Sequence, residues 1–186
     1  MKRVLPLLLC IMLLTGCDSR QTVLDAGHQL RNDILAAEGC SFVSVITADY
    51  GDELYEFSMQ CEFDKDGALS FTILTPESVS GITGSIDSNE GALTFDDQVL
   101  AFNMLADGQI TPVSAPWVMM RTLRGGYISA FSKEKDSYFL QFDDSYNQSP
   151  MTVDLWINDS GDILRGEFLW NGRRILSVQV LDFKLM

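Results

Sequence analysis

The chain has 186 residues, a formal net charge of −13 and 46% hydrophobic residues. This length is enough for one domain with a sizeable core. The acidic charge argues against binding to nucleic acid and against lying flat on anionic lipid, because both are negatively charged themselves.

The first residues predict a secretory signal. Lys2 and Arg3 precede an uncharged apolar stretch, residues 4–14, which leads into Thr15-Gly16-Cys17. As a helix this stretch would rise about 16 Å, roughly half of a ~30 Å hydrocarbon core, so it is too short for a stable membrane span. Removal of residues 1–16 would take away two cations and no acid, which changes the formal charge from −13 to −15.

Thr15 and Gly16 ahead of Cys17 resemble the lipobox of bacterial lipoproteins. The resemblance implies that residues 1–16 are a signal peptide, that the thiol of Cys17 takes a diacylglycerol, and that residues 17–22 form a lipidated tether to the cell membrane. Asp18 resembles the signal that keeps a lipoprotein on the inner membrane of a cell with two membranes. The alternative is an ordinary secretory signal that happens to contain a cysteine.

Residues 21–38 predict an amphipathic helix at the start of a single domain, residues 23–186. Apolar and small residues recur there at helical spacing: Val23, Leu24, Gly27, Leu30, Ile34 and Ala37. His28 is the only histidine in the sequence and is expected on the polar side of this helix. A zinc site with several imidazoles or a Ser-His-Asp arrangement is therefore not expected.

After this helix the hydrophobic period changes to two. Residues 54–63 alternate between apolar and polar side chains, which predicts a half-buried strand, and residues 42–48 are its expected partner. The hairpin register that places the apolar residues on one face puts Cys40 opposite Cys61. We therefore expect a Cys40–Cys61 disulfide in an oxidising compartment, with two buried free thiols as the alternative.

Further strands are predicted wherever alternating segments are bounded by turn residues: 69–75, 92–95, 99–103, 127–132, 138–142, 152–157, 164–170 and 175–183. The Asn171-Gly172 pair is the strongest hairpin signal among them. The segment from Thr75 to Gly84 is too irregular for a core strand. Roughly nine to eleven strands predict an α+β fold that is mainly antiparallel β, with one large curled sheet.

A short helix is predicted to interrupt the strands. Pro116 suits its first turn, residues 117–124 form it, and Gly125-Gly126 closes it. Its side chains are apolar nearly all round: Trp117, Val118, Met119, Met120 and Leu123. We therefore expect this helix to be buried on more than one side.

Paired carboxylates are the main candidates for chemistry: Asp64/Asp66, Asp96/Asp97, Asp143/Asp144 and Asp159/Asp162. Each pair falls where a turn is expected, so solvated turns are favoured over a hydrolase that uses two carboxylates. No Gly-rich phosphate-binding loop is present in the sequence. We expect no enzymatic activity, no metal and no cofactor.

Three segments carry a family resemblance: residues 76–84, 93–97 and 153–157. With the order of helix, sheet and interrupting helix, they make the chain from about residue 21 similar to bacterial lipoproteins of the LolA/LppX-like superfamily, in particular its anchored members. The resemblance implies an unclosed β-barrel, or half-barrel, wrapped around helices. It also implies a cavity between sheet and helices that holds lipids or acyl chains.

These observations predict a membrane-anchored extracytoplasmic lipoprotein that binds an acyl chain or other apolar ligand without catalysis. The expected cavity lining comes from two strands and the interrupting helix, which would act as a lid: Tyr55, Phe57, Met59, Leu69, Phe71, Ile73, Trp117, Met120 and Leu123. The alternative is an envelope interaction or assembly module with a filled core and no ligand.

Overall fold

The computed structural model describes residues 18–49, 51, 54–87, 91–95, 98–102, 105–106, 109–144 and 151–186. The described helices are α2 (Asp18–Ala36) and α3 (Ala115–Gly125). The strands are β1 (Gly39–Asp49), β2 (Leu54–Asp64), β3 (Leu69–Thr75), β4 (Thr83–Ile86), β5 (Gly91–Phe95), β6 (Gln98–Phe102), β7 (Leu105–Ala106), β8 (Gln109–Ile110), β9 (Tyr127–Glu134), β10 (Ser137–Asp143), β11 (Met151–Asn158), β12 (Ile163–Trp170) and β13 (Arg173–Leu185). Two short 3₁₀ helices, Glu77–Val79 and Pro112–Ser114, complete the described elements.

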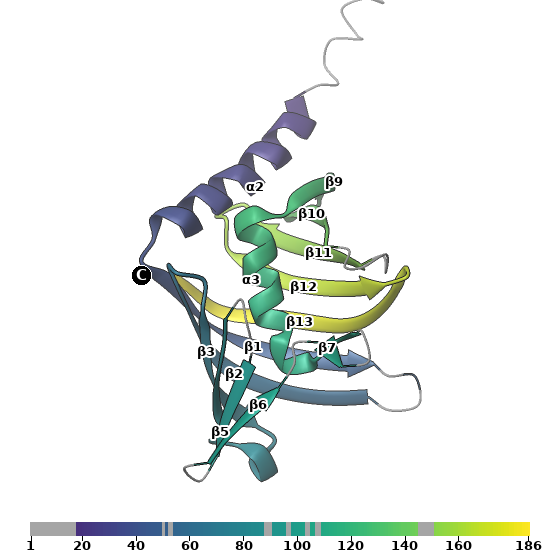
Figure 1. The fold of residues 1–186 in the computed structure, drawn as a ribbon. Coiled ribbons are helices and arrows are strands. Elements are labelled where there is room, and N and C mark those ends of the chain that lie inside the picture. The colour runs from purple at the N-terminus through teal and green to yellow at the C-terminus, as the bar shows by residue number, and fades with distance from the viewer. Residues whose placement is uncertain are drawn as a thin grey trace, which may run out of the picture.

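Eleven of these strands form one antiparallel sheet that is not closed into a barrel. The order is β6-β5-β4-β3-β2-β1-β13-β12-β11-β10-β9, so β6 and β9 are its edges. Figure 1 shows the sheet curling around α3, while α2 lies at the side of β9 and β10. The predicted curled half-barrel agrees with this arrangement.

The sheet consists of two meanders that meet at a single strand pair. Strands β1 to β6 form the first meander and β9 to β13 the second, and β1 pairs with β13 between them. The pairing extends to the last residue, because the Met186 N–H donates to the Gly39 carbonyl and the Met186 carbonyl accepts from the Glu38 N–H. Residues that are far apart in sequence therefore hold the two halves together.

The two helices approach the concave face of the sheet closely at glycine residues. A Cβ at Gly27 of α2 would lie 3.0 Å from Leu140 Cδ1 on β10, and a Cβ at Gly166 of β12 would lie 3.1 Å from Met119 Sδ on α3. Glycine permits this close approach because it has no side chain to displace. Val23, Leu30 and Ile34 of α2, and Trp117 to Met120 and Leu123 of α3, are buried in the same hydrophobic cluster as the sheet.

The β1–β2 hairpin has a register that differs from the predicted one by two residues. Cys40 lies opposite Phe63, and Cys61 lies opposite Phe42, so the predicted Cys40–Cys61 pairing is wrong. Both cysteines remain on the core face, because a shift of two residues preserves the alternation. They are diagonal neighbours, and diagonal Cβ atoms lie farther apart than the ~3.8 Å of a disulfide. In the structure both are buried free thiols rather than the predicted disulfide.

These thiols should be inert in the folded protein. Burial raises the pKa of both Cys40 and Cys61 to about 12, from an ordinary value of 9.0, and Ser44 Oγ lies 3.4 Å from Cys61 Sγ. Without reductant at pH 8, an alkylating reagent should modify neither thiol before denaturation and both after it. Peptide mapping by mass spectrometry measures this, and a disulfide-linked Cys40–Cys61 peptide would contradict it.

The same pKa shifts give the sign of a pH effect. Above pH 9 the unfolded chain can ionise these thiols, whereas the folded chain cannot until about pH 12. Their contribution to the free energy of unfolding should therefore be fully present below pH 9 and should diminish as the pH rises towards 12.

Most predicted strands are present with ends that differ by a few residues, and the interrupting helix is longer by two residues at its start. The segment from Thr75 to Gly84, expected to be irregular, contains a 3₁₀ turn and leads into β4, which pairs with both β3 and β5. No helix among the described residues is long and apolar enough to cross a membrane. The predicted signal peptide, residues 1–16, and the predicted lipidation site Cys17 lie outside the described residues.

Candidate functional site

The residues predicted to line a cavity mostly fill the core instead. Seven of the nine are buried: Met59, Leu69, Phe71, Ile73, Trp117, Met120 and Leu123. Phe57 is partly buried against them, and Tyr55, which pairs with Ala48 near the hairpin turn, is 49% exposed. The buried side chains belong to one continuous cluster, so the concave face is occupied by the chain's own residues.

A pocket of about 410 Å³, called the α2–α3 pocket below, lies beside this core, where the end of α2, the outer part of α3 and the β2–β3 turn meet. Its lining combines apolar and charged side chains: Leu35, Phe63, Asp66, Gly67, Trp117, Arg121, Arg124 and Gly125. Leu35 is 50% exposed, whereas Trp117 is buried. The volume falls within the range of small-molecule sites in proteins.

Helix α3 places three of these side chains on one face. Trp117, Arg121 and Arg124 are spaced by four and then three residues, so they follow one another along the helix surface. The opposite face carries Met119, Met120 and Leu123 into the core. The same short helix therefore closes the core on one side and lines the pocket on the other.

The β2–β3 turn forms the facing wall of the pocket. Asp64 accepts hydrogen bonds from the N–H groups of Gly67 and Ala68 at 2.8 and 2.9 Å, and Gly67 has a φ of +95° that favours glycine. The Gly67 carbonyl then accepts a 2.9 Å hydrogen bond from the Trp117 indole. On its other side, the Lys65 N–H donates to the Glu38 carbonyl at 3.0 Å. The turn is thus fixed to α3 and to the end of α2.

Two guanidinium groups at the pocket lie over aromatic rings. The Arg121 guanidinium is 5.0 Å from the centre of the Trp117 ring, and that of Arg124 is 5.5 Å from the centre of the Phe63 ring. Arg121 also forms an ion pair with Asp144, whose pKa is raised by burial and lowered in part by this arginine. Arg124 Nη2 donates to the Lys65 carbonyl at 2.7 Å. These contacts hold both cations beside the apolar wall.

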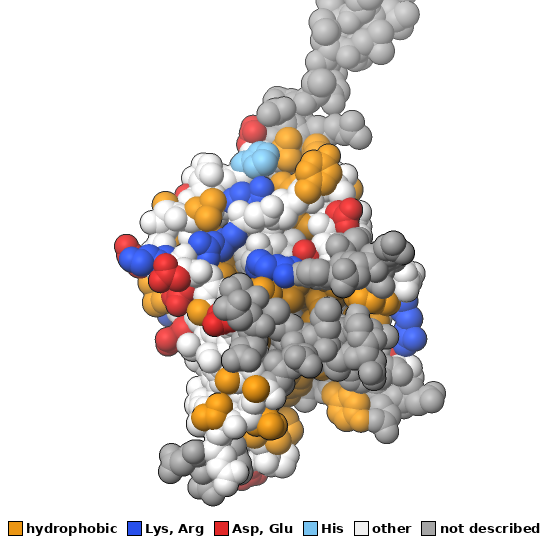
Figure 2. All heavy atoms as spheres, in the orientation of Figure 1, with side chains coloured by type: hydrophobic (Ala, Val, Ile, Leu, Met, Phe, Trp, Pro, Cys, Tyr) orange, Lys and Arg blue, Asp and Glu red, His pale blue; other side chains and the backbone are white. Residues whose placement is uncertain are grey.

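Arg31 joins the two helices next to the pocket. Its Nε and Nη2 donate to the carbonyls of Leu123 and Gly126, each at 2.6 Å, so it satisfies acceptors at the end of α3. Its guanidinium also lies 5.9 Å from the centre of the Phe142 ring, and burial lowers the pKa of Arg31. Figure 2 shows Lys and Arg side chains gathered on the face that carries α2 and α3.

Two grooves occur on the outer face of the sheet. One, of about 390 Å³, is lined mainly by hydroxyl and amide side chains of β2 to β5, among them Gln60, Thr72 and Thr83. The other, of about 560 Å³, lies on β12 and β13 beside Arg165, Glu167 and Arg174. Neither groove is lined by an aromatic side chain from a helix, whereas Trp117 of α3 lines the α2–α3 pocket.

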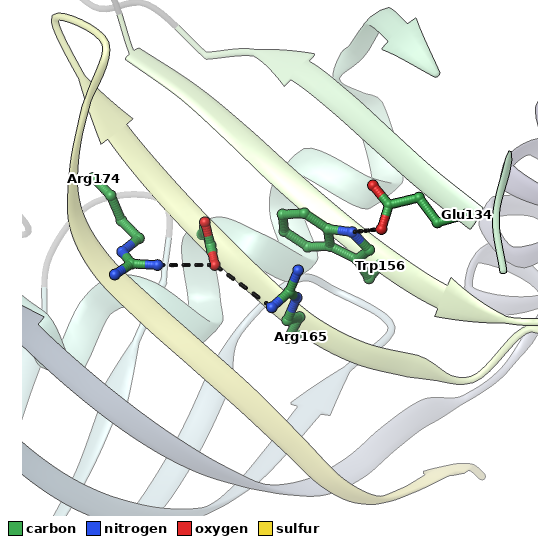
Figure 3. A network of polar contacts seen from close by, with 5 residues as sticks. Glu134, Trp156, Arg165 and Arg174 are labelled. Atoms are coloured by element: carbon green, nitrogen blue, oxygen red, sulfur yellow. Dashed lines mark hydrogen bonds and ion pairs between the residues drawn. The ribbon is translucent and has the colours of Figure 1, made fainter. Parts of the chain in front are cut away.

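A polar network ties together the outer faces of four strands beside the second groove (Figure 3). The Trp156 indole donates to Glu134 at 3.0 Å, and the Arg165 guanidinium lies 3.8 Å from the centre of the Trp156 ring. Arg165 and Arg174 both approach the same Glu167 oxygen, at 3.8 and 3.2 Å. These side chains form hydrogen bonds and ion pairs with one another across β9, β11, β12 and β13, so the network links the four strands on their outer face.

The paired carboxylates occupy separate places in the fold. Asp64 caps the β2–β3 turn, Asp144 pairs with Arg121, and Asp162 accepts from the Asn158 amide at 2.9 Å. Asp96 and Asp97 lie outside the described residues. Within the part of the chain that the structure describes, no group of three or more His, Cys, Asp or Glu residues is placed to hold a metal ion.

The sequence did not single out the pocket as a site. Trp117 alone among its lining residues had been predicted to line a cavity. The spacing of Trp117, Arg121 and Arg124 along one helix face is the signal that could have indicated the arginines. Leu35 and Gly67 join the site only through tertiary packing, for which the sequence contains no local pattern.

Comparison with known proteins gives structural matches but no sequence matches. No family model matches the chain, and no curated protein does. An uncharacterised conserved protein from Thermus thermophilus is 13% identical, with 90% of this chain and 87% of that chain covered and a TM-score of 0.49. A LolA superfamily protein from Nitrosomonas europaea is 10% identical, with 90% and 94% covered and a TM-score of 0.44.

The lipoprotein LppX from Mycobacterium tuberculosis is also similar, at 14% identity, with 89% of this chain and 96% of that chain covered and a TM-score of 0.45. The structures similar to this chain thus include a LolA superfamily protein and the lipoprotein LppX.

Proposed function

We propose that the chain is an extracytoplasmic lipoprotein, anchored through Cys17, that binds an acyl chain or other apolar ligand and catalyses no reaction. The α2–α3 pocket, rather than the concave face of the sheet, is the proposed binding site. The observation that carries this proposal is the position of Leu35, Phe63 and Trp117, which together offer an apolar wall beside a filled core.

The apolar wall suits part of a hydrocarbon chain. Each methylene group that leaves water for this wall contributes about 0.8 kcal/mol. Trp117 is held by its hydrogen bond to Gly67, so its ring needs no reorientation when a ligand binds. A ligand chain would extend from this wall past the exposed side chain of Leu35.

Helix α2 connects the residue that follows the proposed anchor to the pocket. Helix α2 begins at Asp18, directly after Cys17, and its 19 residues rise about 28 Å before Ala36. Leu35 of the pocket lies at the far end of this helix. The acylated end would therefore lie in the bilayer, on the inner membrane if the cell has two, while α2 holds the pocket within about 28 Å of it.

One observation favours the second candidate, an envelope interaction or assembly module without a ligand. Met59, Leu69 and Met120 have no exposed surface, so the interior between sheet and α3 is filled. In this case the α2–α3 pocket would take no amphiphile, and the surface of the sheet would serve a protein partner.

Photocrosslinking tests the proposal on the full chain, purified from membranes and reconstituted in phosphatidylcholine nanodiscs. The intact mass of the purified protein tests for acylation at Cys17, and a mass that corresponds to an unmodified thiol there would contradict the proposed anchor. Diazirine-bearing hexadecanoate and hexadecanol serve as the two probes. At least one should label peptides containing Phe63 or Trp117, and failure of both would favour the interaction module.

Leu35→Glu should lower labelling at least about fivefold, because it replaces an apolar wall worth about 1 kcal/mol with a charge. Leu54→Glu is the matched control, since Leu54 is 69% exposed and lies outside the pocket. Equal loss in both variants would show that the effect does not come from the pocket.

A further inference from the structure

We infer that the α2–α3 pocket selects amphiphiles with an anionic head group, a carboxylate or a phosphate, and that Arg124 contacts this group. The inference rests on the proposed function and specifies its ligand class. It assigns the apolar chain to Phe63, Trp117 and Leu35, and it assigns the charge to the helix face beside them.

The side chains that line the pocket do not share the excess of acidic residues found in the protein as a whole. The chain has 26 acidic residues against 13 lysines and arginines. Yet the pocket lining contains two arginines, Arg121 and Arg124, and one carboxylate, Asp66. Arg121 is neutralised in part by its ion pair with Asp144, which leaves Arg124 as the cation available to an incoming anion.

Arg124 is not required to stabilise the end of its own helix. A cation in the last turn of a helix often serves the carbonyl groups there. In this protein Arg31 already donates to the carbonyls of Leu123 and Gly126. Arg124 instead reaches across to the Lys65 carbonyl in the β2–β3 turn, over the Phe63 ring, and so borders the pocket.

The guanidinium of Arg124 is also preorganised for an oxyanion. It is a planar group with five N–H donors that can bind a carboxylate or phosphate through two parallel hydrogen bonds. The ring of Phe63 and the Lys65 carbonyl fix its plane, and the side chain is half-buried, so a head group at the surface can reach it. Asp66 also lines the pocket, and its carboxylate repels an anion that approaches it.

Competition measures the selectivity on the same nanodisc-bound full chain at pH 8. Diazirine-bearing hexadecanol is the photoprobe, and unlabelled hexadecanoate, hexadecyl phosphate and hexadecanol are the competitors. At least one anion should compete about tenfold more strongly than the alcohol, since one charge-assisted hydrogen bond accounts for such a factor. Comparison of the two anions decides between a carboxylate and a phosphate head group.

Arg124→Gln should remove this preference, and a cooperative thermal unfolding transition followed by circular dichroism shows that the variant is folded. Asp66→Asn should increase the preference, because it removes the opposing charge. Arg165→Gln is the matched control, as Arg165 also lies over an aromatic ring but on the outer face of the sheet.

Equal competition by all three compounds, or an anion preference that Arg124→Gln leaves intact, would overturn the inference while the proposed function stands. If the photoprobe and the competitors all fail to bind, the proposed function fails with it.

Discussion

Replacing Arg31 with alanine should lower the free energy of unfolding by about 3 kcal/mol. The substitution removes two charge-assisted hydrogen bonds and leaves the Leu123 and Gly126 carbonyls without these donors. It also removes a side-chain link that joins α2 to the end of α3 by hydrogen bonds. Urea denaturation followed by circular dichroism measures the change.

Arg173→Ala is the matched control for this prediction. Arg173 forms an exposed ion pair with Asp49 at 3.4 Å, and both side chains are about half exposed. Its loss should cost less than about 1 kcal/mol, because water screens such pairs. Arg31→Lys should recover little stability, since a lysine ammonium group lacks the planar arrangement of N–H donors with which the guanidinium binds both carbonyls. Equal effects of Arg31→Ala and Arg173→Ala would contradict the role given to Arg31.

Phe168→Ala should lower the free energy of unfolding by about 3–5 kcal/mol. The Phe168 side chain is fully buried on β12, between Val153 of β11 and Leu176 of β13. The cost combines lost transfer free energy with the cavity left in a filled core. Thermal and chemical denaturation of the purified variant give the value.

Tyr127→Ala provides the comparison, because Tyr127 is 76% exposed on the edge strand β9. Its substitution should change the free energy of unfolding by less than about 0.5 kcal/mol. If Phe168→Ala cost no more than this, the concave core would be loosely filled. A ligand cavity between sheet and α3 would then again be a credible alternative to the α2–α3 pocket.

The strands could be predicted because their burial alternates. Residues 54–63 belong to a sheet that is buried on one face, and the apolar side of β2 matches the predicted one from Met59 to Phe63. β4 was missed because Gly84 leaves its place on the core face empty of side chain. A Cβ at Gly84 would come within 2.4 Å of the Phe71 ring, which occupies that space. The segment up to Gly84 was predicted to be too irregular for a core strand because its glycine offers no apolar side chain, whereas in the sheet the Phe71 ring fills that place.

The register of the first hairpin could not be settled from alternation. Registers that differ by two residues leave every side chain on the same face, so both place Cys40 and Cys61 in the core. The last described pair of the observed hairpin is Asp49 with Leu54, which is two residues out of register with the predicted pairing. The pairing of two thiols depends on this difference, which no pattern of apolar residues reports.

The α2–α3 pocket was the least predictable part, because three separate elements supply its lining. Leu35 is on the exposed side of α2, Gly67 lies in a turn, and Arg124 is at the end of α3. Each has an ordinary local explanation as a surface residue, a turn glycine or a cation in a last helical turn. Only the packing of α3 against the β2–β3 turn brings them to one site.

The junction between β1 and β13 has a consequence for biogenesis. The ribosome delivers β1 early and β13 late, so β1 has only β2 beside it until the final strand has been made. During that interval its free backbone groups form a template to which another nascent chain can attach. A chaperone that covered the open edge of β1 until β13 arrives would prevent this misplaced pairing.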